Sequence, residues 1–199
     1  MHDALAKVFT DLWLELGRGS VDRRHGFHVP VIATLGAHGA PEARTVVLRR
    51  VLADAAEIHC HTDIRSGKVA EICAEPRVSW HFYDAHRKVQ LRIAALAEIV
   101  ADGPRADEAW SRSAPTSRRC YLAPARPGSE CDAPSPNLPE AMRGRRPSDE
   151  ETLPGRANFA LVVTRATSID WLFLESDGHQ RARFTRGASD AWHGTWVEP

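Results

Sequence analysis

The spacing of hydrophobic residues changes along the chain and divides it into helical and extended segments. Residues 3–16 carry apolar side chains at helical spacing, and Gly17 and Gly19 are expected to end this helix. From Phe27 onward the pattern becomes that of β-strands. We predict strands at 27–35, 43–51, 57–62, 78–83, 89–100, 159–164 and 169–174, then a closing segment around Phe184 and 192–196.

Short links join most of these strands, so consecutive strands are expected to run antiparallel. Two helices interrupt them, one at 66–74 that begins at Ser66 and one at 104–112 that begins at Pro104. The stretch 123–139 holds five prolines in 17 residues and predicts an extended loop, continued by polar residues to Gly155 with one weak helix. Six or seven strands without βαβ alternation predict a mainly β (α+β) fold, an antiparallel closed or split β-barrel with flanking helices.

Length and charge narrow the class of protein. A chain of 199 residues predicts a single domain over 1–199, with 1–20 as the N-terminal helical region and 123–157 as a Pro-rich and polar insertion. The 26 basic residues equal the 26 acidic ones, which argues against nucleic-acid binding and against a polybasic membrane surface. No apolar run reaches the ~20 residues of a spanning helix, and Met1-His2-Asp3 lacks the basic start of a secretion signal. We therefore expect a cytoplasmic protein with reduced cysteines.

The basic residues are 23 arginines and only 3 lysines. Genomic base composition is one explanation of this bias. Arginine clusters that bind planar or phosphate anions are the functional alternative, because the guanidinium fork suits such groups. Only the positions of the arginines in the fold separate the two.

The segment 62–68 joins a predicted strand end to a predicted helix start. Free amides at a helix N-terminus, together with Arg65 and Lys68, form a plausible phosphate site. The alternative is an ordinary N-cap at Ser66 with solvated basic residues. The segment is not a Walker A loop, because Thr62 stands where that motif needs glycine.

Three further patterns carry candidate chemistry. Strand alternation places Arg44 and Arg49 on opposite faces, so a site that uses both needs a bulge or a strand end between them. The side-chain amide of Gln90 suits the edge of a heteroaromatic ring, although a polar stripe facing solvent is the alternative. His59 and His61 share a strand face, but no carboxylate or cysteine spacing completes a metal set, so no metal is expected.

In their order along the chain these motifs resemble the pyridoxine/pyridoxamine 5′-phosphate oxidase family of FMN-binding split-barrel proteins, as a divergent branch. The match is good over 27–98, fair over 158–199 and poor over 100–157. The motifs that carry it are Arg44-x-Val46-x-Leu48-Arg49, His61-Thr62, Ser66-x-Lys68, Glu75-Pro76-Arg77-Val78, Gln90-x-Arg92-Ile93, Trp171, Arg183-Phe184 and Trp192.

The resemblance implies an FMN-binding homodimer with the cofactor at the interface. It implies that Arg44 and Lys68 neutralise the phosphate, that Gln90 contacts the isoalloxazine edge, and that Trp171 and Arg183 come from the partner subunit. The full implied set of cofactor-binding residues is Arg44, Thr45, Val46, Arg49, His61, Thr62, Ser66, Lys68, Gln90, Trp171 and Arg183. Arg49 and Arg181 are the implied catalytic residues, which would orient a substrate anion.

Departures from the family pattern affect the substrate more than the cofactor. Gly67 replaces a basic residue, and only Gly128-Ser129 remains of an expected Gln-Ser pair. Ala114 and Arg118 stand where the family holds the substrate phosphate, and an Arg-x-His pair is reversed as His179-Gln180-Arg181.

The expected function is therefore an FMN-dependent oxidoreductase that passes a hydride from a small substrate to flavin and on to O₂. A flavin reductase or oxidase for another small molecule is an alternative. A non-catalytic flavin- or haem-binding protein is another, with His61 as the one axial ligand that can be named.

Overall fold

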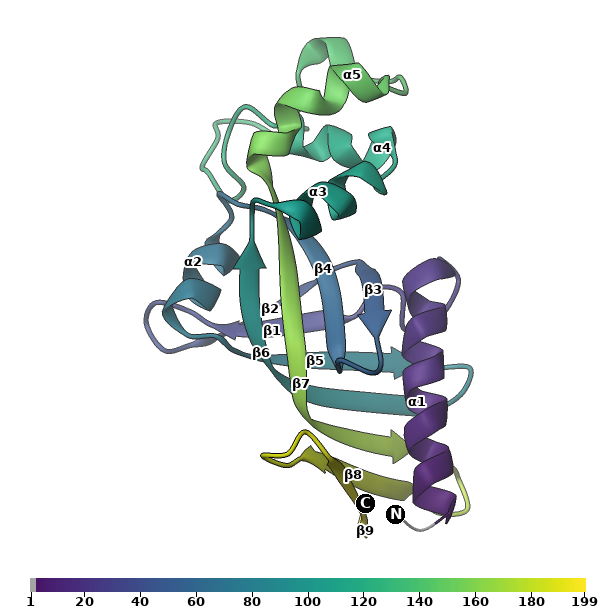
Figure 1. Cartoon of the computed structure of the whole chain (residues 1–199). Helices are drawn as coiled ribbons and strands as arrows, with labels where there is room; N and C mark the ends of the chain where they lie inside the picture. The colour runs from purple at the N-terminus through teal and green to yellow at the C-terminus, as the bar shows by residue number, and fades with distance from the viewer. Residues whose placement is uncertain (1–2) are drawn as a thin grey trace.

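The computed structural model describes residues 3–199 and is built around one nine-stranded antiparallel sheet (Figure 1). Met1 and His2, at the start of the predicted helical region, lie outside the described residues. The strands are β1 (Val31–Leu35), β2 (Pro41–Thr45), β3 (Leu48–Leu52), β4 (Glu57–Asp63), β5 (Arg77–Asp84), β6 (Val89–Val100), β7 (Phe159–Phe173), β8 (Gln180–Arg186) and β9 (Trp192–Val197). The helices are α1 (Asp3–Val21), α2 (Gly67–Ala74), α3 (Pro104–Ser111), α4 (Pro115–Arg118) and α5 (Asp149–Thr152), with 3₁₀ turns at Arg119–Leu122, Glu140–Met142 and Leu153–Asn158.

The sheet curls into a barrel. Its strands follow the order β2-β1-β5-β6-β7-β4-β3, and the link between β2 and β3 returns to the segment before β1. Backbone bonds from Val46 N to the Pro30 carbonyl and from Leu48 N to the His28 carbonyl, both 2.9 Å, close the circuit. The prediction of an antiparallel barrel with flanking helices is thus confirmed.

Strand β7 gives the barrel its split character. Its first half pairs with β4 and its second half with β8, while β6 runs along its whole length. The prediction of two separate strands at 159–164 and 169–174 was wrong. A register shift in the β6–β7 pairing at Ala94/Ala95 takes up the bend, so the chain continues as one 15-residue strand.

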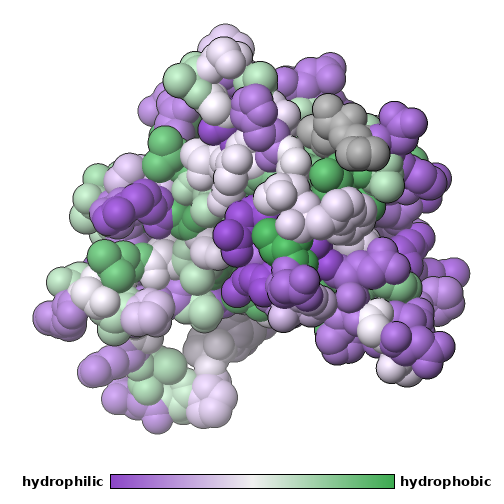
Figure 2. Space-filling model, turned by 90° about the horizontal axis from the view of Figure 1, so that it is seen from below, coloured by the Kyte–Doolittle hydropathy of each residue, from purple (hydrophilic) through white to green (hydrophobic). Residues whose placement is uncertain are grey.

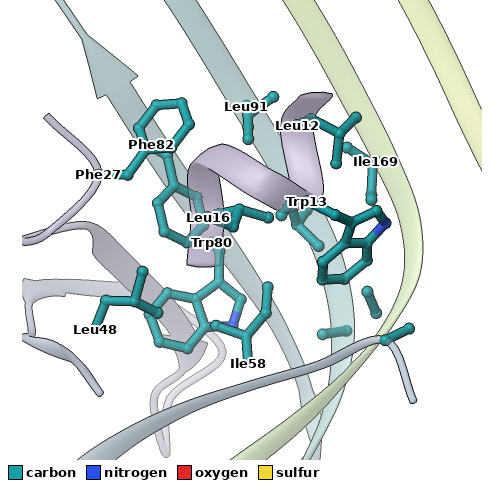
Figure 3. Close-up of a cluster of buried hydrophobic side chains, with 14 of the residues drawn as sticks. Leu12, Trp13, Leu16, Phe27, Leu48, Ile58, Trp80, Phe82, Leu91 and Ile169 are labelled. Atoms are coloured by element: carbon teal, nitrogen blue, oxygen red, sulfur yellow. The ribbon is translucent and has the colours of Figure 1, made fainter. Parts of the chain in front are cut away.

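Alternation along the strands and the apolar stripe of α1 form one core. Strand β5 alternates exposed and buried residues, with Trp80 and Phe82 fully buried. Helix α1 lies against the barrel and directs Leu12, Trp13 and Leu16 into the same cluster (Figures 1 and 3). The Trp80 indole N–H donates to Thr164 Oγ1 at 3.0 Å, so the largest buried side chain has its polar atom satisfied.

Helix α1 continues past the two glycines that were expected to end it, as far as Val21. A Cβ on Gly19 would lie 2.9 Å from the Phe27 Cβ, whereas one on Gly17 would meet nothing within 4 Å. Gly19 therefore allows the returning chain to pass close to the helix. The glycine that was interpreted as a helix stop is therefore required by close packing instead.

Two predicted strands are shorter than expected. The strand predicted at 27–35 begins only at Val31, and the one predicted at 43–51 is broken after Thr45. The break, together with a register shift between Leu48 and Arg50, supplies the irregularity that a site using Arg44 and Arg49 requires. The strand number is nine rather than six or seven. The break adds one strand, the continuous β7 removes one, and the predicted closing segment forms two strands, β8 and β9.

The segment 104–158 covers one end of the barrel with short helices, and both ends of the described chain lie at the other (Figure 1). Residues 123–139 form an irregular loop as predicted, whereas α4 and the three 3₁₀ turns were not foreseen. Trp110, Tyr121 and Phe159 form a second small core that anchors this helical segment.

The surface visible from below is a mosaic of hydrophilic residues and small apolar groups, without one dominant apolar area (Figure 2). Within residues 3–199, none of the helices combines the length and the apolar character that crossing a membrane requires.

Candidate functional site

A cavity of about 300 Å³ lies where β4 ends and α2 begins, and we call it the Lys68 pocket. Seven of the predicted cofactor-binding residues line it, namely Thr45, Val46, Arg49, His61, Thr62, Ser66 and Lys68. They come from the broken β2–β3 strand, from the end of β4 and from the first turn of α2. The structure thus gathers residues of three predicted motifs, spread over residues 45–68, into one place.

Lys68 is a half-buried cation whose neighbours in this pocket are hydroxyl groups. Its Nζ donates to Thr62 Oγ1 at 3.1 Å and to Ser66 Oγ at 3.2 Å. Ser66 occupies the N-cap position of α2, but its side chain makes no capping bond. Burial lowers the pKa of the Lys68 ammonium and the charge of Arg44 adds to this, whereas Cys60, Glu71 and Asp63 oppose it. An anion that entered the pocket would restore the balance of charge.

The wall of the Lys68 pocket suits a phosphate monoester. One ammonium and two hydroxyls converge on it, from the end of β4 and the first turn of α2. The carboxylate that lines the pocket, Asp63, is engaged by Arg65 through contacts of 2.7 and 2.9 Å. The chemistry of the donor set therefore fits the phosphate of FMN.

Arg44 sits beside the Lys68 pocket but does not line it. Its guanidinium donates to Glu71 at 2.9 Å and to Thr34 Oγ1, and Thr34 also donates to Glu71. The charge of Arg44 is therefore shared with a carboxylate inside the chain. The resemblance gave Arg44 and Lys68 equal parts in holding the phosphate, whereas the structure brings only Lys68 to the pocket wall.

A second cavity, of about 470 Å³, adjoins the first, and we call it the arginine pocket. It lies between β3, β4 and α3, and the two cavities share Arg49 and His61. Its lining includes Arg23, Arg49, Arg50, Arg105 and Arg112, with Glu108 as a lining carboxylate. Arg50 and Arg112 contact Glu108 at 3.1 and 3.2 Å. The pocket is positively charged overall and open to a small anionic molecule.

His61 lies in the wall between the two pockets. Burial lowers its pKa to about 3, and the positive charges of Arg49 and, when protonated, His59 add to the effect. Its ring packs edge-on against Phe159 at 4.8 Å between centroids. His61 is therefore neutral at physiological pH and presents an aromatic, uncharged face to both cavities.

This neutral histidine makes stability depend on pH. In the unfolded chain a histidine titrates near 6.5, so between pH 6.5 and 3 the unfolded state binds more protons than the folded one. We therefore expect the free energy of unfolding to fall as the pH is lowered from 7 to 5, by at most about 1.4 kcal/mol per unit from this residue. Urea titrations at several pH values should show a shallower decline in His61→Asn. If the free energy of unfolding fell equally steeply with pH in the wild-type protein and in His61→Asn, His61 would not be the buried neutral group responsible.

Four predicted residues lie elsewhere in the same chain. In the sheet, Leu161 lies between His61 and Val100, and Gln90 is about ten residues, or roughly 33 Å of strand, further along β6. Trp171 pairs with Leu91 beside it, and Arg181 and Arg183 pair with Leu172 and Asp170. Gln90, Trp171, Arg181 and Arg183 are thus close to one another and distant from the Lys68 pocket.

Asp170 organises this distant group. Its carboxylate contacts Arg92 at 2.9 Å, Arg181 at 2.8 Å and Arg183 at 3.8 Å. The side chains of Arg92 and Arg183 remain about half exposed. The outer face of β6–β8 therefore carries a net positive patch, which we call the Asp170 patch.

Arg118 has a structural task. It is 6% exposed and donates to the carbonyls of Trp110 and Ser111 and to Asp149, at 2.7–2.9 Å. Its guanidinium also lies over the Trp110 ring. It faces neither pocket and ties α3, α4 and α5 together, whereas Ala114 does line the arginine pocket.

Several lining residues were not singled out from the sequence. Arg23, Arg105 and Arg112 line the arginine pocket, and Cys120 and Tyr121 line the Lys68 pocket. They come from the turn that follows α1 and from the helical segment 104–122, which are far apart in the chain, so no local spacing marks them. The surplus of arginine was the one available signal. Among residues 3–199 no group of three His, Cys, Asp or Glu side chains is suited to a metal ion.

Comparison with known proteins points to the same family as the sequence motifs. Residues 11–101 match the family model described as pyridoxamine 5′-phosphate oxidase, FMN-binding domain. Pyridoxine/pyridoxamine 5′-phosphate oxidase 2 from Arabidopsis thaliana is 26% identical over 93% of each chain.

Solved structures show the same fold. A pyridoxamine 5′-phosphate oxidase-related, FMN-binding protein from Nostoc punctiforme has a TM-score of 0.76, with 21% identity and full coverage of both chains. PhzG from Burkholderia lata has a TM-score of 0.68 and 17% identity, covering 98% of this chain and 92% of its own. The cofactor of this chain is FMN. In its family-model match over residues 11–101, its curated relative and its fold, the chain resembles the pyridoxamine 5′-phosphate oxidase-like family of FMN-binding split-barrel proteins.

Proposed function

We propose that this protein is a homodimeric FMN-dependent oxidoreductase that oxidises a small anionic molecule and uses O₂ as the final acceptor. The observation that carries the proposal is the pair of adjoining cavities that share Arg49 and His61. One has the donor set for the FMN phosphate, and the other is an open, arginine-lined space for a substrate. FMN supplies the hydride acceptor, which no side chain of the protein can provide.

Each pocket residue has a task in this scheme. Lys68, Ser66 and Thr62 hold the phosphate, and the neutral ring of His61 packs beside the flavin. Arg49 reaches both cavities and makes no ion pair among the described residues, so its charge is available to orient a substrate anion. Of the two predicted catalytic residues, Arg49 would act in the pockets of its own chain, and Arg181 would act from the partner subunit.

The dimer follows from the distance between the two groups of predicted residues. Gln90, Trp171, Arg181 and Arg183 cannot reach the Lys68 pocket of their own chain across roughly 33 Å of strand. A two-fold axis would bring the Asp170 patch of one subunit to the pockets of the other, as closed symmetry favours. FMN would then lie between two subunits.

We expect sedimentation analysis to show a species of twice the 22.0 kDa chain mass at micromolar concentration. Arg183→Glu should convert it toward monomer and weaken FMN binding together, because the same patch serves both. Lys7→Ala, on the exposed side of α1, is the matched control. A 22 kDa species that does not change with concentration and still retains FMN would exclude the dimeric site.

The reaction itself is tested anaerobically. A substrate should bleach the absorbance of the bound flavin, and admission of O₂ should restore it with one peroxide formed per turnover. Small aromatic carboxylic acids and phosphate esters, tested against their uncharged amides and alcohols, match the charge of the arginine pocket. Bleaching by uncharged compounds alone would contradict the proposed substrate class, and no bleaching by any of them would favour a non-catalytic flavin-binding protein.

A further inference from the structure

His59 and Glu57 form a buried pair in the wall of the arginine pocket. The two side chains are on the same face of β4, and His59 Nε2 lies 2.9 Å from Glu57 Oε2. Their residues are 3% and 7% exposed. His59 nevertheless lines the cavity, so part of its ring faces the space where a substrate would lie.

Glu57 is held by more than the histidine. Arg105 of α3 donates to Glu57 Oε2 at 2.8 Å, and Arg165 of β7 lies 3.6 Å from its other oxygen. Burial alone would raise the pKa of the Glu57 carboxyl, but the hydrogen bond from His59 and the charge of Arg105 lower it below its usual value. Glu57 is therefore an ionised, fixed acceptor that orients the His59 ring.

This hydrogen bond defines which nitrogen of His59 is available. An ionised Glu57 only accepts, so Nε2 carries the proton and donates it. Nδ1 is then the acceptor nitrogen, and it makes no hydrogen bond to any residue in the part of the chain that the structure describes. A neutral imidazole with a carboxylate behind it and a cavity beside it has the arrangement of a general base.

The charges around His59 keep it neutral until a proton arrives. Burial lowers its pKa, Glu57 opposes this, and the positive charges of Arg105 and Arg50 lower it further. His61, on the same strand face, is neutral as well. A proton accepted at Nδ1 would be stabilised by Glu57, the one carboxylate in contact with the ring.

We propose that His59 is the proton acceptor of the oxidation, with Glu57 as its positioning residue. This rests on the proposed function and adds the acid–base half of the reaction. A substrate of the form H–C–X–H, with X nitrogen or oxygen, loses the C–H hydrogen as hydride to the flavin and the X–H proton to Nδ1 of His59. The electron pair of the X–H bond forms the C=X double bond, and the imidazolium remains paired with Glu57. Substrates are therefore small acids that carry an amine or hydroxyl at the carbon that is oxidised.

The proton transfer is tested without turnover in the FMN-loaded protein with ¹⁵N-labelled histidine. The probe is 4-nitrophenol, a weak acid that cannot be oxidised in this way, and 4-nitroanisole is the probe without a proton. At pH 7 we expect His59 to be neutral with Nε2 protonated. Saturating 4-nitrophenol should shift its Nδ1 resonance to that of an imidazolium, while 4-nitroanisole should not. The signal is assigned by its loss in His59→Gln.

Two matched variants separate proton acceptance from simple binding. Glu57→Gln keeps an acceptor oxygen but removes the charge, so the imidazolium signal should be lost. Glu98→Gln removes an exposed carboxylate of β6 that does not line the arginine pocket, and the signal should remain. A His59 ring that stays neutral with 4-nitrophenol, or equal effects of the two variants, overturns the inference. Flavin bleaching by a substrate with His59 unresponsive would overturn the inference and leave the proposed function standing. A responsive His59 without flavin bleaching would overturn the proposed function and, with it, the role of His59 in the oxidation.

Discussion

Replacing Lys68 by alanine is expected to weaken FMN binding by roughly 100-fold, about 2.7 kcal/mol. Lys68 is the half-buried cation that lines the Lys68 pocket, and its partners there are hydroxyl groups rather than a carboxylate. Without it, the phosphate would enter a space whose other charged wall residues are Asp63 and Arg49. Fluorescence quenching of FMN on titration with the dialysed protein measures the change.

Riboflavin provides the internal control for this experiment. It has the same ring system but no phosphate, so Lys68→Ala should change its affinity little. Arg44→Ala is expected to weaken FMN binding less than Lys68→Ala, because Arg44 already shares its charge with Glu71. A loss of affinity that is equal for FMN and riboflavin would show that Lys68 supports the fold of the pocket rather than the phosphate.

Turnover of pyridoxamine 5′-phosphate is expected to be weak or absent, with kcat/KM below about 10⁴ M⁻¹s⁻¹. A substrate phosphate needs charge-assisted partners, and the loss of one bidentate arginine costs roughly a hundredfold. Arg118, the candidate at the family's position, is buried and committed to Trp110, Ser111 and Asp149. Arg119 donates to the carbonyls of Met142 and Arg145, and Arg181 is paired with Asp170.

Oxygen consumption with the FMN-loaded protein decides the question. A value above 10⁴ M⁻¹s⁻¹ would show that other arginines hold the substrate phosphate, and Arg23 and Arg105 of the arginine pocket would be the first to test. Arg24→Ala, next to Arg23 but outside the pocket lining, is a matched control for Arg23→Ala.

Local patterns predicted most elements because they reflect burial directly. The strand β6 spans the predicted residues 89–100 and alternates buried and exposed residues from Leu91 to Leu96, and α2 begins after Ser66, where a cap residue was identified. The errors arose where a local signal had a non-local cause. Gly19 resembles a helix stop, but it serves the contact with Phe27, 8 residues later.

The candidate site was only partly readable from the sequence. Residues 61–68 form one wall of the Lys68 pocket because they are neighbours in the chain, and the match to known motifs identified them. The arginine pocket brings together Arg23, Arg49 and Arg105 from three distant segments, so no spacing reveals it. The pairing of Arg44 with Glu71 was also hidden, because it depends on how α2 packs against β1 and β2.

The absorption spectrum of the purified protein is the most direct test of FMN binding in the Lys68 pocket. After incubation with FMN and removal of the free flavin, we expect flavin bands near those of free FMN at one FMN per chain, and their loss in Lys68→Ala. A protein that retains no flavin, or that shows a haem Soret band instead, would contradict it.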